Sequence, residues 1–274
     1  MLGQDLVACF TGRHEALPLS RSDADITDSR AIAQAIARSR PDAVIHAAAF
    51  TAVDECERKP ELAFEVNAEG TRHVALGCRD SGVPMLYIST DYVFDGTKTS
   101  PYVETDEPNP INVYGKSKLQ GENYVRQTVE RFWIVRVSWL FGPLGRNFVG
   151  TILDRARRGE ALRVVDDQAG APTYTADASE KVKQILEGGA PGLYHVTNQG
   201  YCSWFDFARE ILAQAGLEGV PLSPISTAAS GRAAARPANS RLANTRLAAS
   251  GLGLLPPWQD ALRRYLLRES RARN

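Results

Sequence analysis

Short apolar runs of strand length alternate with longer stretches of helical spacing along most of this chain. Residues 42–48 (DAVIHAA) are almost continuously apolar, which is typical of a strand buried on both faces. Helical spacing follows at 61–81, a second strand-like run covers 85–90 (MLYIST), and residues 113–129 are again helical. This alternation predicts a parallel sheet with helices on both faces, which is an α/β doubly wound fold of Rossmann type.

The same pattern predicts further strands at 16–20, 133–138, 162–165 and 193–197, and further helices at 29–38, 147–158, 176–187, 203–215 and 258–267. Proline, serine, alanine and glycine dominate residues 220–257, where periodicity is weak. We therefore expect a dinucleotide-binding domain at 1–197. A smaller substrate-binding lobe, built mainly from 198–257, should lie over the carboxyl edge of the sheet, and residues 258–274 should form a C-terminal helix and tail.

The opening residues resemble the end of a glycine-rich phosphate-binding turn. Such a turn normally follows a strand and opens a helix whose N-terminus holds a pyrophosphate. Here Gly3 would be the last glycine of the turn, and residues 4–10 would form the first helical turns. Since the first strand of a doubly wound sheet is central, we expect Met1 to be an internal methionine of a longer natural chain. The upstream reading frame would test this.

Composition excludes several classes of partner. Lysine and arginine together number 32, as do aspartate and glutamate, so no overall charge recruits nucleic acid or an anionic membrane. The four cysteines have no metal-ligand spacing, and no metal is expected. No apolar run is long enough to span a bilayer, and the start lacks a signal peptide. We expect a cytoplasmic protein.

Tyr114 and Lys118 stand four residues apart in the sequence VYGKSKL. On a helix this spacing places both side chains on one face, where an ammonium can draw the high pKa of a phenol toward neutrality. Alone, the pair is weak evidence, because an exposed helix face is the more common reason for a tyrosine and a lysine at this spacing. However, the preceding strand ends in Ser89-Thr90-Asp91, and hydroxyls at the carboxyl end of a parallel strand lie where ligands bind. The combination predicts a carbonyl reductase with Tyr114 as proton donor, Lys118 as its partner and Thr90 beside them.

Several stretches, in order, resemble the dTDP-4-dehydrorhamnose reductase family of extended short-chain dehydrogenases/reductases. They are HAAAFTAVDECE (46–57), VNAEGT (66–71), YISTDYVFDG (87–96), YGKSKLQGE (114–122), RVSWLFGP (136–143), DDQAGAPT (166–173), GLYHVTN (192–198) and ARPANSRL (235–242). The resemblance implies reduction of the C4 ketone of dTDP-4-dehydro-L-rhamnose by a nicotinamide cofactor. Thr90, Tyr114 and Lys118 would form the catalytic set, and a dTDP-sugar would be the partner.

The resemblance also implies binding residues. Lys118 would hold the nicotinamide ribose, with Tyr114 beside it, and further cofactor contacts would come from Gly3, Asp25, Ile26, Ala48, Ala49 and Thr51. The sugar would face Thr90, Asp91 and Trp139, with Val53 nearby. Arg236 is expected at the diphosphate, although a solvated loop arginine fits as well. Arg21 could meet a 2′-phosphate, which favours NADPH over NADH, or it could equally be solvated, in which case NADH is possible.

Three alternatives stay open. The first is a related 4,6-dehydratase, a class that carries Thr-Asp-Glu at this strand end, whereas Asp91 is followed here by Tyr92. The second is a related epimerase, a class that retains its cofactor tightly. A non-catalytic module similar to the regulatory subunit of some methionine adenosyltransferases is the third alternative. The sequence leaves a monomer and a homodimer open.

Overall fold

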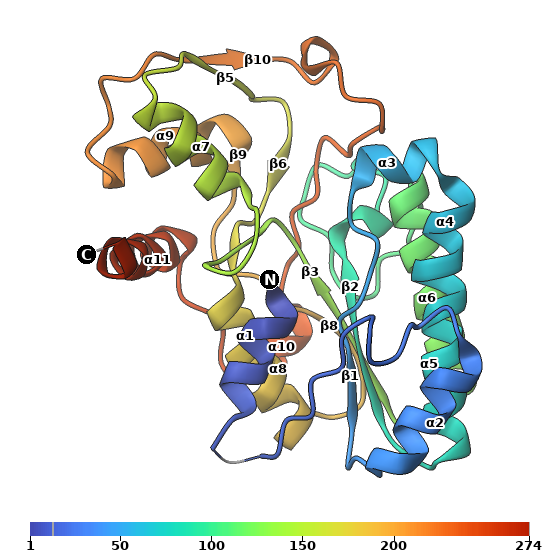
Figure 1. The fold of residues 1–274 in the computed structure, drawn as a ribbon. Coiled ribbons are helices and arrows are strands. Elements are labelled where there is room, and N and C mark those ends of the chain that lie inside the picture. Colours follow the sequence, from blue (N-terminus) through green and yellow to red (C-terminus); the bar gives the residue numbers. More distant parts are fainter. Residues whose placement is uncertain (13, 274) are drawn as a thin grey trace.

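The computed structural model describes residues 1–12 and 14–273, with side chains as far as residue 270. Four parallel strands form its central sheet in the order β1-β2-β3-β8 (Figure 1). They are β1 (Val44–His46), β2 (Met85–Thr90), β3 (Phe132–Val137) and β8 (Gly192–His195). All four follow the order of the predicted strands, and β2 begins and ends at the predicted residues.

Helices cover both faces of this sheet, as Figure 1 shows. One face carries α2 (Ser29–Ser39), α5 (Gly70–Asp80) and α6 (Val113–Thr128), which pack on Met85 and Tyr87 of β2. The other carries α1 (Leu2–Phe10), α8 (Thr175–Gly188) and α10 (Thr245–Ala249), which pack on Leu86 and Ile88. Successive strand residues alternate between the faces, as strand geometry requires. The doubly wound α/β fold is confirmed.

Three short helical elements connect β1 to α5. They are α3 (Val53–Arg58), α4 (Pro60–Phe64) and η1 (Glu65–Glu69), and η1 has the π-helical hydrogen bonding that marks an inserted residue. Asn67 lies in this π-helical turn. Its Oδ1 accepts from the Phe50 amide at 2.7 Å, and its Nδ2 donates to the Phe50 carbonyl at 3.0 Å and to Ser117 Oγ at 3.0 Å. The turn after β1 is therefore held by a side chain of the following helix.

A second, smaller lobe lies beyond the carboxyl edge of the sheet (Figure 1). Its elements are β4 (Leu140–Phe141), α7 (Phe148–Arg157), β5 (Leu162–Val165), β6 (Ala169–Gly170), β7 (Thr173–Tyr174), β9 (Cys202–Ser203), α9 (Trp204–Gln214), β10 (Leu222–Ile225), η3 (Ala228–Ser230) and α11 (Trp258–Arg273). One core cluster joins Phe141, Leu162 and Tyr174 to Phe207 and Tyr265. Residues from both sides of position 197 thus share this core, and the division at 197 stays a prediction.

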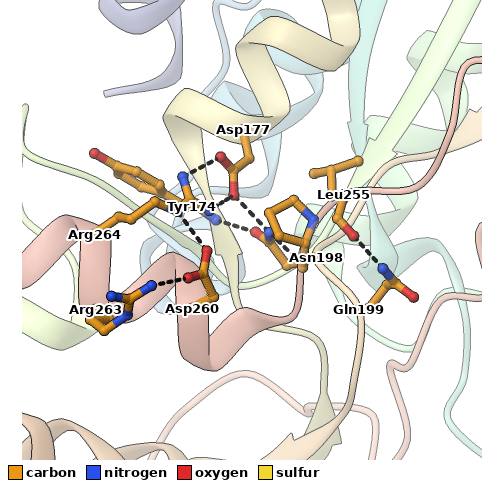
Figure 2. A network of polar contacts seen from close by, with 9 residues as sticks. Tyr174, Asp177, Asn198, Gln199, Leu255, Asp260, Arg263 and Arg264 are labelled. Atoms are coloured by element: carbon orange, nitrogen blue, oxygen red, sulfur yellow. Dashed lines mark hydrogen bonds and ion pairs between the residues drawn. The ribbon is translucent and has the colours of Figure 1, made fainter.

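The C-terminal helix α11 is tied to α8 by the polar network of Figure 2. Arg264 of α11 donates from both terminal nitrogens to Asp177 at the start of α8, each at 2.7 Å, and from Nε to Asp260 at 2.7 Å. Asn198 donates to Asp177 at 2.8 Å and accepts from the Tyr174 amide at 2.9 Å. The network fixes α11 against α8 where the lobe meets the sheet.

The strand expected at 16–20 is wrong. These residues form no strand, and the side chains of Leu17 and Leu19 are 54% and 58% exposed. A strand is stabilised by ladder hydrogen bonds and by burial of one face. Among the described residues β1 has only β2 as a neighbour, so the segment meets no strand with which it could pair.

Candidate active site

The predicted catalytic residues meet at the carboxyl end of β2. Thr90 is the last residue of this strand, and Asp91 opens the short 3-10 helix η2 (Asp91–Val93); both are buried. Thr90 Oγ1 accepts from the Tyr92 amide at 3.1 Å and donates to Asp91 Oδ1 at 2.9 Å. The hydroxyl therefore has a fixed position at the edge where a doubly wound fold binds its ligands.

Tyr114 comes to the same place because α6 packs very close to η2. Asn112 caps the helix, with its Oδ1 accepting from the Gly115 amide at 2.8 Å. A Cβ at Gly115 would lie 2.0 Å from the Tyr92 carbonyl oxygen, so no other residue allows this approach. Burial raises the pKa of Tyr114 well above its ordinary value, and a hydrogen bond with the Thr90 side chain opposes the shift. The phenol is thus protonated and adjacent to Thr90.

Lys118 lies one turn further along α6 and is almost completely buried. Its ammonium donates to the Ile88 carbonyl at 2.7 Å and lies 4.0 Å from the centre of the Tyr87 ring. Burial lowers the pKa of Lys118, and the negative charge of Glu122 opposes this only in part, so that the pKa is about 7. The remaining N–H groups have no protein acceptor among the described residues, so they are available to a ligand.

A buried ion pair supports this helix from below. Glu122 accepts from Arg136 in bidentate fashion, at 2.8 and 2.7 Å, and from Ser89 Oγ at 2.6 Å. The side chains of Glu122 and Arg136 are 0% and 1% exposed. Arg136, together with Ser89 and Arg126, keeps the pKa of Glu122 low although burial opposes this. A carboxylate is therefore fixed one turn beyond Lys118.

Asp91 accepts hydrogen bonds from hydroxyl groups of three segments. Burial raises its pKa to about 6, and hydrogen bonds from Ser240, Thr90 and Ser138 oppose the shift. Ser138 follows β3 and donates at 3.0 Å. Ser240 belongs to residues 234–240, which we call the strap because they cross from α3 to β6 at this edge. The strap is held by Asp54 at one end and by Ala169 at the other.

Arg236 of the strap is not a solvated loop residue. Its side chain is 7% exposed, and its terminal nitrogens donate to Asp54 at 3.1 and 2.9 Å. Arg236 is the largest cause that lowers the pKa of Asp54 to about 2. The guanidinium also contacts the Tyr92 side chain. Its partner Asp54 directly follows Val53 in α3, and the diphosphate contact stays a prediction.

The expected cofactor residues surround the carboxyl end of β1. Gly3 of α1 faces Ala47, since a Cβ at Gly3 would lie 4.0 Å from that of Ala47. Ala48 and Thr51 are exposed beside this contact, and Ala49 is half-buried. These small residues leave the approach to the backbone open, which fits a flat dinucleotide. Lys118, the residue expected at the nicotinamide ribose, has N–H groups without a protein acceptor among the described residues.

The turn at 21–27 is the expected adenosine end. Asp25 Oδ1 accepts from the Thr27 amide and hydroxyl, and Arg21 Nε donates to Asp25 Oδ2 at 2.8 Å. The Arg21 side chain is 81% exposed, so its terminal nitrogens can reach a phosphate. Ile26 instead packs against Gly70, where a Cβ would lie 2.8 Å from it, and its carbonyl pairs with His73 Nδ1 at 2.9 Å.

Sequence reasoning missed the residues that hold the predicted ones. Asp54 binds Arg236, the Tyr87 ring lies against the Lys118 ammonium, and Trp204 stacks on Trp139. Glu122, held by Arg136, raises the pKa of Lys118. Asp54 and Arg236 are 182 positions apart. Nothing in a single sequence signals such a pair, although DECE and SWFDF both lie in or beside the motifs already noted.

Among the residues that the structure describes, no group of three or more His, Cys, Asp or Glu side chains is arranged to hold a metal ion. In the same part of the chain, no helix is both long and apolar enough to cross a membrane.

Known proteins are similar to this chain in sequence and in structure. Residues 1–271 match the model of the RmlD substrate binding domain. The spore coat polysaccharide biosynthesis protein SpsK of Bacillus subtilis is 40% identical over 94% of this chain and 90% of its own length. A dTDP-4-dehydrorhamnose reductase of Streptomyces griseus is 40% identical over 96% and 88%. The crystal structure of the dTDP-4-dehydrorhamnose reductase of Bacillus anthracis with NADP is 38% identical, with a TM-score of 0.95 and coverage of 97% and 95%.

Proposed function

This chain belongs to the RmlD substrate binding domain family, and from that membership together with the site we propose that it reduces dTDP-4-dehydro-L-rhamnose to dTDP-L-rhamnose with NADPH. It is an oxidoreductase of dTDP-rhamnose biosynthesis, as its reductase relatives are named. The observation that carries the proposal is the contact of Tyr114 with Thr90, one helical turn from a buried ammonium, at the carboxyl edge of the sheet.

The chemistry of the chain's own residues follows from this arrangement. Tyr114 donates the proton to the C4 oxygen, because burial keeps its phenol protonated until that oxygen becomes basic. Thr90 orients the carbonyl by a hydrogen bond. Lys118 stabilises the phenolate that remains and holds the nicotinamide ribose with its unused N–H groups. NADPH, when bound, supplies the hydride to C4.

The other predicted contacts belong to the same proposal. Gly3, Ala48, Ala49 and Thr51 would contact the cofactor beside β1, and Asp25 with Ile26 its adenosine end. Arg21 would pair with the 2′-phosphate, since its terminal nitrogens are exposed. NADH would lack this contact. On the substrate side, Asp91, Trp139 and Val53 would face the sugar, and Arg236 the diphosphate.

Steady-state assays with dTDP-4-dehydro-L-rhamnose and NADPH test the proposal. Tyr114→Phe should lower kcat by about 10²–10⁴-fold, the range of one general acid, with an unchanged NADPH dissociation constant. Lys118→Met should impair both quantities. Wild-type protein that binds NADPH but does not oxidise it with the keto-sugar would favour the regulatory-module alternative, and a dehydrated or epimerised product would favour the other enzymes of the fold.

Compartment and assembly are part of the proposal. We expect the cytoplasm because the four cysteines are free thiols, which suits a reducing environment. The expected partner is the dTDP-sugar, with neither nucleic acid nor membrane. Sedimentation velocity distinguishes a monomer from a homodimer.

A further inference from the structure

Trp139 has an unusual backbone conformation for a bulky residue. It directly follows Ser138, whose hydroxyl binds Asp91, and its φ of 45° lies in the left-handed region. That conformation is unfavourable for an L-residue that is not glycine. It therefore persists only because surrounding contacts hold it, and those contacts define what the indole can do.

The first contact covers one face of the indole. The ring of Trp204, the first residue of α9, stacks on Trp139 with centroids 3.6 Å apart and planes 10° from parallel. Trp204 is itself supported by Phe148 at 4.6 Å. A stack this close leaves no room for another ring on the same side.

The second contact is with Gly170. A Cβ built there would lie 2.2 Å from Cε2 of Trp139 and 2.5 Å from both Cζ2 and Nε1. If this Cβ lay in the plane of the indole, outside Cε2, it would be nearer to Cζ2 and Nε1 than to Cε2. It is instead nearest to Cε2, so it lies over one face of the ring. Trp204 already covers one face, so the Gly170 backbone covers the other.

A short ladder brings the two contacts together. Strands β6 and β9 pair antiparallel with Gly170 opposite Cys202, and Trp204 comes two residues after Cys202. The Trp139 carbonyl accepts from the Thr173 amide at 3.1 Å. Both sides of the clamp therefore come from the small lobe, while Trp139 comes from the end of β3.

We propose that Gly170 and Trp204 are positioning residues that clamp Trp139 so that its edge, and not its face, meets the substrate. This rests on the proposed function. The Nε1–H group of Trp139 donates no hydrogen bond to a described residue. The nitrogen is not one of the buried polar atoms without a partner, so it is exposed to solvent. The clamped indole offers this N–H to an oxygen of the nucleotide-linked deoxysugar, and stacking on the sugar ring is excluded.

The mode of contact is tested by Trp139→Phe. This variant keeps an aromatic face and loses the N–H group, so KM for the keto-sugar should rise about tenfold, the cost of one lost hydrogen bond at a substrate. An unchanged KM would show that the face acts, and would overturn the edge contact. The NADPH dissociation constant should stay unchanged.

The clamp is tested by Trp204→Ala, Trp204→Phe and Gly170→Ala. Removing the ring or adding a methyl group should raise KM for the keto-sugar about tenfold or more through misplacement, with little change in NADPH binding. Trp204→Phe keeps a ring on that face and should restore most of the wild-type KM. A uniform loss of stability and kcat without a KM effect, or failure of Phe to restore KM, would contradict the positioning role.

A spectroscopic measurement is independent of activity. Two stacked indoles give an exciton couplet in far-ultraviolet circular dichroism, which Trp204→Phe and Trp139→Phe should each abolish. Trp258→Phe is the matched control, because Trp258 meets Phe207 edge-on at 5.5 Å and stacks on no indole. A couplet that survives in Trp204→Phe overturns the clamp. Inactive wild-type protein would instead overturn the proposed function, while the couplet still decides the clamp.

Discussion

The ammonium of Lys118 is a charge removed from water, and the neighbouring groups decide how far it stays protonated. Burial lowers its pKa, whereas Glu122 raises it and the Tyr87 ring faces it at 4.0 Å. His46 stacks on the same ring, and its own pKa falls to about 3 through burial and the charge of Lys118. His46 is therefore neutral and does not compete for the proton, so the state of Lys118 depends on these few contacts.

A pH profile should report this state. Activity needs the charged ammonium, and its pKa of about 7 lies below the ordinary value of 10.5. The kcat/KM for NADPH, which reports free enzyme, should be highest below this pKa and fall as pH rises through about 7. Lys116→Met, on the exposed face of the same helix, should leave the profile unchanged. A decline only near the ordinary lysine value would contradict the assignment.

Tyr87 offers a matched pair of variants. A cation over an aromatic ring contributes about 2 kcal/mol when desolvated, and a shift of one pKa unit corresponds to about 1.4 kcal/mol. Tyr87→Leu should therefore move the decline in kcat/KM to lower pH by about one unit or more. Tyr87→Phe keeps the ring and loses the hydroxyl, which makes contacts of 3.4–3.5 Å with two carbonyls and a hydrogen bond with Thr71 but does not contact the ammonium. Its profile should therefore match the wild type. Equal shifts in both variants would assign the effect to the hydroxyl.

Among single residues, those that could be predicted from the sequence have partners close to them along the chain. Tyr114 and Lys118 share one helix, and Thr90 ends a strand of unmistakable apolar pattern, so their meeting follows from periodicity and topology. Asp54 with Arg236 could not be predicted, because the strap has no periodic pattern and its position depends on the assembled lobe. Contacts of this kind are products of tertiary packing.

Most elements were predictable because their local signals agree with the fold. Asp28, Asn147 and Ser203 cap helices that the sequence placed within a residue or two. The exceptions lack such agreement. Helix α3 is only six residues long and has no side-chain cap, and the segment at 16–20 has a strand-like pattern without a paired neighbour. Short elements depend on their surroundings more than on propensity.

The link between α8 and α11 gives a stability prediction at this scale. Arg264→Met removes two charge-assisted hydrogen bonds from Asp177, whose side chain is 12% exposed, and should lower the free energy of unfolding by about 1–2 kcal/mol. Arg263→Met is the control, because Arg263 is 64% exposed and its terminal nitrogen donates only to Asp260 (Figure 2). It should change stability by less than about 0.5 kcal/mol. Urea midpoints measured at constant m-value test both, and equal losses would contradict the assignment.

In the whole molecule, the strap connects parts that fold around different cores. Asp54 accepts from the Ala234 amide at 3.0 Å and from Arg236, while Asn112 donates to the Ala235 carbonyl at 2.8 Å. At the other end, Ser240 donates its amide to the Ala169 carbonyl of β6 at 2.8 Å. The substrate-binding lobe is thereby fixed to α3 and α6 across the mouth of the site.

Releasing this connection should make the chain easier to cleave there. Asp54→Ala leaves the Ala234 amide and the Arg236 guanidinium without their acceptor, so trypsin should cut after Arg232 several-fold faster, as local opening becomes easier. KM for the dTDP-sugar should rise in the same variant. Glu55→Ala, which removes only the surface pairs with Arg58 and Lys59, should do neither. Mass spectrometry of timed digests locates the cut, and equal cleavage in both variants would refute the role of Asp54.

The π-helical turn has a consequence for how this protein can be altered. A carboxamide is chemically a copy of the peptide group, so Asn67 gives Phe50 the same donor and acceptor that an adjacent strand would offer. The shape of residues 47–52 is therefore templated by a side chain on the next helix. If that loop were grafted into another scaffold, it would keep its form only when the asparagine was transferred with it.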